Sequence, residues 1–510
     1  MKSSNRIMVN TGVMYARVAI TMIITLLSSR WILMALGKED FGIYNLVAGL
    51  LALLMFLNLS MSTATQRFLS YYLAKEKGKY LNEVFYLSCV LHLCIAIVIL
   101  VLIEVGGQLM IKYLLQIPDG KYDVTMFVLH SLSISTFFTI ISVPYNASLL
   151  THENIFFVAC VNIIESILKL STAIFLLYFT GPRLKVYAIC IMGIQIMSTI
   201  FYRFYCNFKY PETKFIIHKI QNLSLLKEFL GYVGWNLIGS ISSLCRTQGI
   251  SMLLNSFYGV AINAAYGIAT QVKGQLSFFS SSIVSAARPQ IVKSEGEGNR
   301  DRMLALSNST CKITFLMLSM IAIPLIIEME YVLRLWLKDV PEYTVSFTRL
   351  ILILNLVFQF SLGLSIGIES VGNIRTLQII VGGMHFIVLP IAYIMLKYGM
   401  KPYTIFIMVI LEECLGIIIK LVISHNITGL NIYKFIKRVL VPSIITFGLV
   451  FCVCYLFHMI INESFIRLIF ICFSSILAMI ILCSCYTLNE IEKIKIIDMI
   501  RSLKSKLCKR

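Results

Sequence analysis

The chain has 510 residues, of which 58% are hydrophobic and 14% charged, and its formal net charge is +19. Soluble globular proteins contain about 45–50% apolar and about 25% charged residues, so this composition excludes a soluble enzyme. Apolar runs of about 20 residues, the length that crosses a bilayer core about 30 Å thick, recur along the whole chain and leave no room for a large catalytic domain.

Fourteen apolar segments with helical periodicity predict an all-α polytopic membrane protein and exclude a β-barrel. The first segment continues without a small-residue cleavage site, so it is interpreted as an uncleaved helix rather than a signal peptide. The expected bounds are 8–35, 41–73, 84–106, 124–148, 155–178, 186–206, 226–252, 260–287, 304–327, 344–368, 376–396, 404–424, 439–460 and 465–486.

Lys and Arg are distributed unequally between the two sets of alternating loops. One set, which includes both termini, holds 26 of these cations and the opposite set holds nine. Because positively charged loops stay on the cytoplasmic side of a membrane, both termini are expected in the cytoplasm.

A short internal repeat relates the first two segments to the seventh and eighth. A constant shift of 222 residues carries Gly37, Tyr44, Ser60 and Ala64 onto Gly259, Tyr266, Ser282 and Ala286. An even number of helices separates the copies, so the repeat predicts two parallel six-helix lobes, the arrangement of rocking transporters. The expected organisation is a first lobe over 1–206, a linker over 207–225, a second lobe over 226–424, two further helices within 425–486 and a basic tail over 487–510.

The tail carries seven Lys/Arg interleaved with isoleucines. This pattern predicts a short helix on anionic phospholipid, although ordinary topology signalling explains it nearly as well. A nucleic-acid partner is not expected, because no contiguous soluble surface exists to carry one. The 14 cysteines fall mostly inside apolar runs without metal-ligand spacing, so no metal site and no cofactor are expected.

Charged residues within the apolar segments are the candidate functional residues, since a charge in the bilayer usually faces a cavity or a partner. Arg17, Arg246 and Lys273 have no acidic residue three or four positions away, and we expect them to line a water-filled cavity and to bind phosphate. Further cationic candidates are Lys169 and Lys312. Glu165, Glu412 and Glu413 are candidates for binding a coupling ion, and Glu165 can also pair with Lys169 on one helix face.

Six other arginines lie near the ends of the apolar segments. Snorkelling of the long side chain to the membrane surface accounts for them without any function. They are Arg30, Arg67, Arg203, Arg288, Arg349 and Arg467.

Several stretches resemble a known family. They are Arg30-Trp-Ile-Leu-Met-Ala-Leu-Gly-Lys-Glu-Asp-Phe-Gly-Ile-Tyr44, Ser60-Met-Ser-Thr-Ala-Thr-Gln-Arg-Phe68, Ala265-Tyr-Gly-Ile-Ala-Thr-Gln-Val272, Ala287-Arg-Pro-Gln-Ile-Val292 and Leu335-Trp-Leu-Lys-Asp-Val-Pro341. Their order and spacing resemble Wzx-type polysaccharide flippases, which form part of the multidrug/oligosaccharidyl-lipid/polysaccharide (MOP) exporter superfamily, the superfamily that also includes the MATE drug exporters.

The resemblance implies a non-enzymatic transporter in the bacterial inner membrane. Its cargo would be an undecaprenyl-diphosphate-linked oligosaccharide for O-antigen, capsule or exopolysaccharide, moved to the periplasmic leaflet by alternating access. It also implies cationic cavity residues that hold the diphosphate, coupling to H⁺ or Na⁺, and polysaccharide polymerase partners. Fourteen segments suggest that the last two helices help to form a groove for the lipid tail.

Two other functions stay open. A MATE-type drug or cation antiporter is typical of acidic cavities, whereas the apolar segments here contain more cations than acids. A membrane-embedded polymerase or glycosyltransferase generally needs a long periplasmic loop or paired acids at a membrane face, and neither is present in the sequence.

Overall fold

The computed structural model describes residues 3–52, 55–75, 78–113, 120–214, 223–337 and 340–487, and every element in these ranges is helical. The described residues form two compact units, residues 10–237 and residues 238–510 with 1–9. Each of the fourteen predicted segments is helical wherever it is described, which confirms the all-α fold. The predicted tail helix over 487–510 lies almost wholly outside the described residues.

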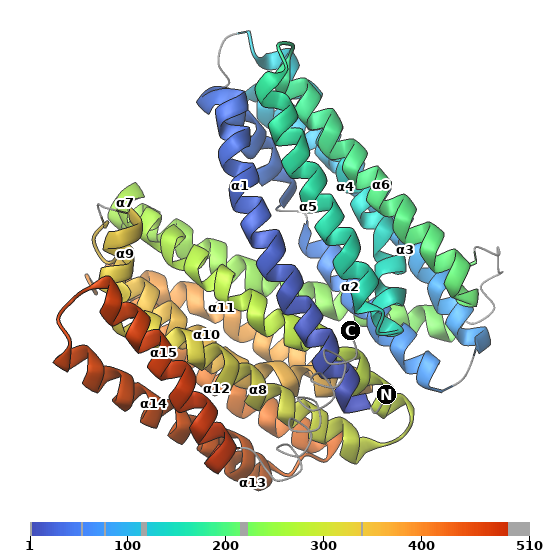
Figure 1. Ribbon diagram of the computed structural model, residues 1–510. Coiled ribbons are helices and arrows are strands. Elements are labelled where there is room, and N and C mark those ends of the chain that lie inside the picture. Colours follow the sequence, from blue (N-terminus) through green and yellow to red (C-terminus); the bar gives the residue numbers. More distant parts are fainter. Residues whose placement is uncertain are drawn as a thin grey trace, which may run out of the picture. The chain divides into compact units, whose positions relative to one another are not determined.

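The unit of residues 10–237 contains six main helices that lie along one another (Figure 1). Helix α4 packs against α2, α3 and α6, and α5 packs against α6. The helices are α1 (Ser3–Ala52), α2 (Met55–Ala74), α3 (Gly78–Tyr113), α4 (Tyr122–Thr151), α5 (Ile155–Tyr178) and α6 (Arg183–Lys209), followed by the 3-10 turn η1 (Pro211–Thr213) and the start of α7 (Leu223–Gly296). Buried residues from α1, α3, α4, α5 and α6 form one hydrophobic core.

The unit of residues 238–510 contains the rest of α7 and a bundle in which α10 lies between α8 and α12. Helices α14 and α15 pack against each other and against α8, and their buried residues join its hydrophobic core. The helices are α8 (Arg300–Ile327), α9 (Met329–Leu337), α10 (Thr344–Val371), α11 (Arg375–Lys397), α12 (Thr404–Thr428), α13 (Ile432–Phe435), the π-helical turn η2 (Ile436–Leu440), α14 (Val441–Ile460), α15 (Phe465–Leu482) and the π-helical turn η3 (Cys483–Thr487).

Two long helices break at the positions that the repeat relates. In α1 Gly37 has φ 77° and ψ 172°, and in α7 Gly259 has φ 79° and ψ −177°. Such angles are essentially restricted to glycine, because a Cβ would make them strained. No atom lies within 4 Å of the position that a Cβ would take at either glycine. Glycine is therefore favoured at these positions by the backbone angles and not by close contacts with neighbouring residues. The structure therefore confirms that the two segments share the same local conformation.

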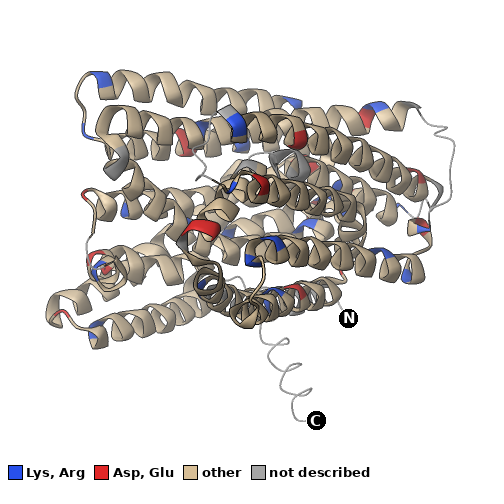
Figure 2. Cartoon of the chain, turned by 90° about the horizontal axis from the view of Figure 1, so that it is seen from above, with Lys and Arg blue, Asp and Glu red and all other residues tan. Residues whose placement is uncertain are grey.

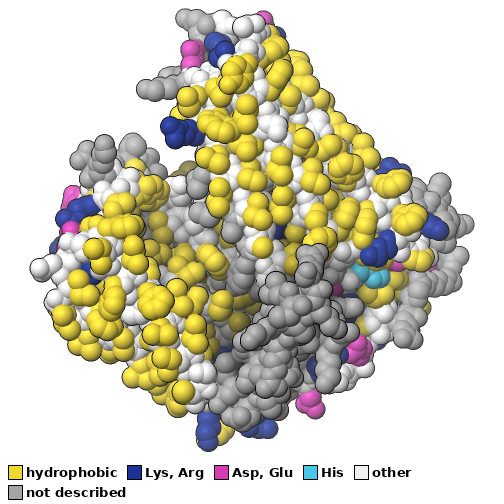
Figure 3. Space-filling view, viewed as in Figure 1, with side chains coloured by type: hydrophobic (Ala, Val, Ile, Leu, Met, Phe, Trp, Pro, Cys, Tyr) yellow, Lys and Arg dark blue, Asp and Glu magenta, His cyan; other side chains and the backbone are white. Residues whose placement is uncertain are grey.

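The outer surfaces of both units are apolar over long stretches. Ten helices among the described residues are long and apolar enough to cross a membrane. Long lengths of helix carry no charge (Figure 2), and hydrophobic side chains cover much of the visible surface (Figure 3). Fully exposed apolar side chains are stable in lipid rather than in water, so this surface indicates a multi-pass membrane protein. Helix α12 is not among the ten because Glu412, Glu413 and Lys420 interrupt it.

Candidate functional site

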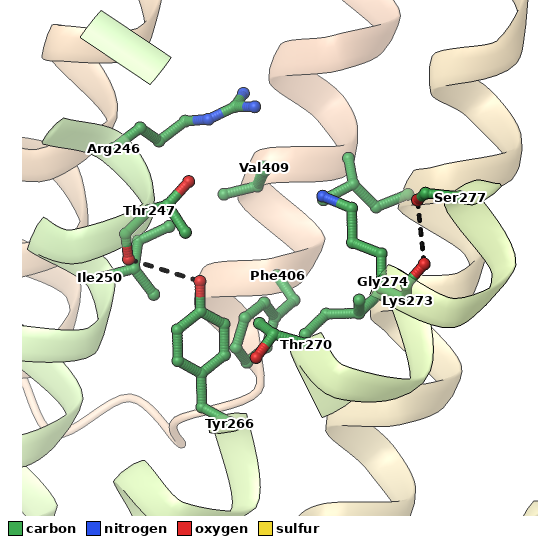
Figure 4. A pocket seen from close by; sticks show the side chains of 12 residues that line it. Arg246, Thr247, Ile250, Tyr266, Thr270, Lys273, Gly274, Ser277, Phe406 and Val409 are labelled. Atoms are coloured by element: carbon green, nitrogen blue, oxygen red, sulfur yellow. Dashed lines mark hydrogen bonds between the residues drawn. The ribbon is translucent and has the colours of Figure 1, made fainter. Parts of the chain in front are cut away.

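A pocket of 220 Å³ opens within the unit of residues 238–510, between the two arms of α7 and the helices α10 and α12. Its lining mixes two cations, four hydroxyl side chains and an apolar wall (Figure 4). The lining residues are Arg246, Thr247, Ile250, Tyr266, Thr270, Lys273, Gly274, Ser277, Ile351, Leu354, Phe406 and Val409.

The break at Gly259 places the two cations of this pocket together. Arg246 precedes the break and Lys273 follows it, 27 residues later in the sequence. In an unbroken helix the rise of about 1.5 Å per residue would separate them by about 40 Å. Because α7 turns back on itself at Gly259, both side chains line one pocket, with the guanidinium and the ammonium directed into the space beside Val409 (Figure 4).

Aromatic residues from α7 and α12 form one wall of the pocket. The rings of Tyr266 and Phe406 are stacked with their centroids 5.6 Å apart, and the Tyr266 hydroxyl donates to the carbonyl oxygen of Thr247 at 3.4 Å. Phe347 packs against Phe406 at a centroid distance of 4.8 Å. These contacts connect the two arms of α7 to α10 and α12, so they hold the pocket in shape.

Arg246 is paired, although no acidic residue lies three or four positions away from it in the sequence. Its Nη1 donates to Oε2 of Glu412 at 2.6 Å, and Nδ1 of His385 lies 2.8 Å from the other carboxylate oxygen. Glu412 is separated from Arg246 by 166 residues, so the spacing of charges along one helix could not reveal the pair. His385 lies in an apolar stretch of α11, and no pattern in the sequence points to it.

Lys273 differs from Arg246 in that its ammonium forms no hydrogen bond or ion pair with any described residue. The side chain is largely surrounded by the walls of the pocket. A cation in this position is stabilised by water or by an anionic ligand. Lys273 is therefore the cation of this pocket that is available to a ligand.

Glu413, the next carboxylate on α12, has other hydrogen-bond and ion-pair partners than Glu412. It accepts a hydrogen bond from the hydroxyl of Ser361 at 2.8 Å and lies 3.4 Å from Nζ of Lys420. The adjacent carboxylates of α12 thus face different partners, as the 100° turn between neighbouring helical residues requires. Lys312 lies elsewhere in the same unit, with its side chain fully buried.

The remaining predicted site residues belong to the unit of residues 10–237. Arg17 is half-buried in α1. Glu165 accepts a hydrogen bond from the hydroxyl of Ser198 on α6, and no ion pair joins it to Lys169 within the described part of the chain. The observed partner of the Glu165 carboxylate thus lies on the neighbouring helix.

Snorkelling is the wrong explanation for four of the six arginines assigned to it. Each of these four has partners inside the fold: Arg67 with Glu228 and three aromatic rings, Arg288 with Glu369, Arg349 with the carbonyl oxygens of Ile326 and Ile327, and Arg467 with Glu328. Arg30 and Arg203 are exposed, in agreement with the expectation.

One of these arginine sites, which has a fully buried carboxylate, joins α14 and α15 to the end of α8. Glu328 has a fully buried side chain and accepts a hydrogen bond from Nη2 of Arg467 at 2.7 Å, while Nδ1 of His458 lies 2.6 Å from its other oxygen. Arg467 also donates to the carbonyl oxygen of Ile461 at 3.2 Å. The cluster of Glu328, His458 and Arg467 is called the clamp below.

An apolar groove of 390 Å³ lies beside the last helices. Side chains of α8, α10 and α14 line it, among them Phe315, Phe360, Phe447 and Phe451, and the lining contains no polar surface. Helix α14 therefore contributes to a groove in addition to packing against α8.

Comparisons with known proteins agree with the fold. Residues 14–175 match the MatE family model. A comparison of the sequence with curated proteins finds no match. Among solved structures, a MOP superfamily transporter from Pyrococcus furiosus with a binding pocket of reverse polarity is similar with a TM-score of 0.72 at 13% identity, over 85% of this chain and 97% of that one.

Two further structures have the same architecture. An outward-facing multidrug resistance MATE family transporter of the MOP superfamily gives a TM-score of 0.73 at 13% identity, over 84% of this chain and 97% of that chain. A MATE transporter in complex with MaD3S gives 0.73 at 14% identity, over 85% and 98%. At this identity these structures show that the chain shares the fold of MATE transporters.

Proposed function

We propose that this protein is a flippase that moves a lipid-linked oligosaccharide diphosphate across the membrane, with the diphosphate bound in the pocket of Arg246 and Lys273. The observation that carries the proposal is the pairing of two cations, one of them without an acidic partner, in a pocket whose described lining contains no carboxylate. Arginine binds phosphate through its planar fork and lysine as a point charge.

Two other features support this cargo. The apolar groove between α8, α10 and α14 offers space for part of a prenyl chain. One of the stretches that resemble polysaccharide flippases, residues 265–272, contains Tyr266 of the pocket and ends directly before Lys273. A pocket of reverse polarity in the Pyrococcus furiosus transporter suggests a different function there, so pocket charge varies among proteins with this fold.

A MATE-type antiporter for cations is the second candidate, and the buried carboxylates of Glu412 and Glu413 favour it. In this alternative the carboxylate of Glu412, once released from Arg246, would bind the cationic cargo. The two functions predict opposite ligand charge, so binding measurements separate them.

The first test measures binding of inorganic pyrophosphate to the purified protein in nanodiscs. Charge-assisted hydrogen bonds contribute about 1.5–3 kcal/mol, so Lys273→Ala and Arg246→Ala are each expected to weaken binding about tenfold to 100-fold. Lys397→Ala, an exposed lysine at the end of α11, is the matched control and should bind like the wild type. Wild-type affinity in both pocket variants would contradict the anion site.

The second test is made in cells. Deletion of the gene is expected to cause accumulation of lipid-linked repeat units on the cytoplasmic leaflet, and complementation by the wild type but not by Lys273→Ala should reverse it. Unchanged surface polysaccharide without accumulation, together with sensitivity to toxic cations, would favour the antiporter instead.

A further inference from the structure

Three cations lie close together directly before α14, where α13 stands at one end of that helix (Figure 1). Lys434 belongs to α13, and Lys437 and Arg438 belong to the π-helical turn η2. Residues three and four positions apart are neighbours on a helix surface, so the three side chains share one face. All three are exposed, and none forms an ion pair or a side-chain hydrogen bond with another described residue. We call this surface the cationic face.

The opposite side of the same segment is fixed to the protein. Phe435 is fully buried and Val439 is 4% exposed, and both belong to the hydrophobic core around α8 and α10. Burial of these two side chains orients the segment, because they lie four positions apart on one side of it. The cationic face is therefore held outward by packing on its other side.

The carboxylates of the turn that leads into α8 are already bound to other cations. Arg300 donates to the backbone carbonyl oxygen of Ile427 at 3.1 Å, which places this turn at the same end of the unit as α13. Arg300 pairs with Glu295, and Arg302 pairs with Glu297 at 3.0 Å. These two acids are thus neutralised within their own turn, and the positive charge of the cationic face is left for a ligand.

The length of α14 places the cationic face at the level of lipid head groups. Helix α14 (Val441–Ile460) has 20 residues and contains no Lys, Arg, Asp or Glu. At about 1.5 Å per residue it is about 30 Å long, which is the thickness of the hydrocarbon core. Lys434 and Arg438 lie about 5–10 Å beyond its first residue, whereas the head-group region extends about 5–8 Å beyond the hydrocarbon core.

Apolar side chains that are exposed on the surface follow the cationic face along the helix. Val441, Ile444 and Ile445 are exposed by 40%, 49% and 41%. Tyr433 is 70% exposed beside the cations, and Nζ of Lys437 lies 5.9 Å from the centroid of its ring. Tyrosine is enriched at membrane interfaces. Cations followed directly by exposed apolar surface fit a phospholipid with an anionic head group better than a soluble anion, which would contact the cations alone.

We propose that the cationic face of Lys434, Lys437 and Arg438 binds the head group of an anionic phospholipid, whose acyl chains lie along the exposed apolar side of α14. Arginine binds the phosphate through its planar fork, and the lysines act as point charges. This site is separate from the basic tail over 487–510 and from the pocket of Arg246 and Lys273. It does not depend on the charge of the transported cargo.

The test uses the full-length protein with Tyr433→p-benzoyl-phenylalanine, a photo-crosslinking residue, in nanodiscs of equal parts phosphatidylglycerol and phosphatidylcholine. Mass spectrometry of the lipid adducts measures which phospholipid lies beside the cationic face. One cation near an anionic leaflet favours an anionic lipid about fivefold, so adducts of phosphatidylglycerol are expected to exceed those of phosphatidylcholine at least about fivefold. Equal amounts of the two adducts would overturn the proposal, and this measurement needs no change to the cations.

Charge variants of the same labelled protein show whether these cations make the selection. The combined substitutions Lys434→Gln, Lys437→Gln and Arg438→Gln are expected to bring the ratio of adducts to about one. Lys397→Gln with Lys401→Gln is the matched control, because these exposed lysines lie at the other end of α12, and it should keep the wild-type ratio.

Two results would contradict the site. An unchanged ratio in the triple variant would assign the selection to other cations, those of the tail included. Loss of the ratio when excess inorganic phosphate is added at constant ionic strength would show that the cationic face selects a soluble anion rather than a lipid.

Discussion

Two clusters in the unit of residues 238–510 use the same three residue types in the same arrangement. In the clamp, Glu328 accepts from Arg467 at 2.7 Å and contacts His458 at 2.6 Å. Beside the pocket, Glu412 accepts from Arg246 at 2.6 Å and contacts His385 at 2.8 Å. In each case one carboxylate joins an arginine and a histidine through separate oxygens.

The surroundings of the two clusters differ. The carboxylate of the clamp is fully buried and joins the end of α8 to α14 and α15. The arginine of the other cluster lines a pocket that also contains the unpaired ammonium of Lys273. The same three residue types are therefore enclosed between helices in the clamp, whereas beside the pocket their arginine adjoins open space and a second cation.

The largest expected effect is on the clamp. Glu328→Ala removes the one carboxylate among the described residues that contacts both Arg467 and His458, and breaking a buried ion pair costs about 3–5 kcal/mol. Equilibrium unfolding in mixed micelles should show a loss of this size. The double variant Glu328→Leu, Arg467→Met is expected to recover most of it, because it leaves no unpaired charge. A loss below about 1 kcal/mol for Glu328→Ala would show that the clamp does not hold the helices.

An intermediate effect is expected for a substitution at Gly259, the break in α7 that brings the two cations of the pocket together. This glycine is not part of the clamp. Gly259→Ala forces a left-handed φ onto alanine, which costs about 1–3 kcal/mol and should weaken pyrophosphate binding by moving Lys273 away from Arg246. Gly267→Ala in the same arm is the control, because no atom lies near its Cβ position and alanine favours a helix. Equal stability and affinity in both variants would contradict a role for the break.

The smallest effect is expected for an ion pair that is only partly buried and includes no histidine. Nζ of Lys121 donates to Asp40 at 2.7 Å, and this hydrogen bond raises the pKa of Lys121. Asp40→Asn should lower the free energy of unfolding by about 0–1 kcal/mol, the usual contribution of an exposed pair.

The pH dependence of this pair follows from the raised pKa of Lys121. A raised lysine pKa stabilises the fold below the ordinary lysine value of about 10.4, and the contribution is lost only above it. The difference between the wild type and Asp40→Asn, measured by unfolding, should therefore stay constant from about pH 6 to 9. A difference that changes within this range would mean that other groups titrate with the pair.

Much of the backbone could be predicted from the sequence. Hydropathy located the helices because each span is a local run of apolar residues, and the shift of 222 residues located both breaks because Gly37 and Gly259 have to adopt the same rare conformation. The types and positions of the buried cations were also visible. Their partners were not, since Arg246 and Glu412 are 166 residues apart and Arg467 and Glu328 are 139 apart.

The sequence by itself determined that the chain is a polytopic helical membrane protein with a repeated break and an excess of cations. Only the tertiary structure decided which cations are neutralised, because charges on different helices meet through packing that hydropathy does not encode. It separated Lys273, which has no ion-pair partner among the described residues, from Arg246, which is held by Glu412. It also showed that Arg467 is enclosed in the fold, because the docking of α15 on α8 brings it to Glu328 before its side chain can reach the membrane surface.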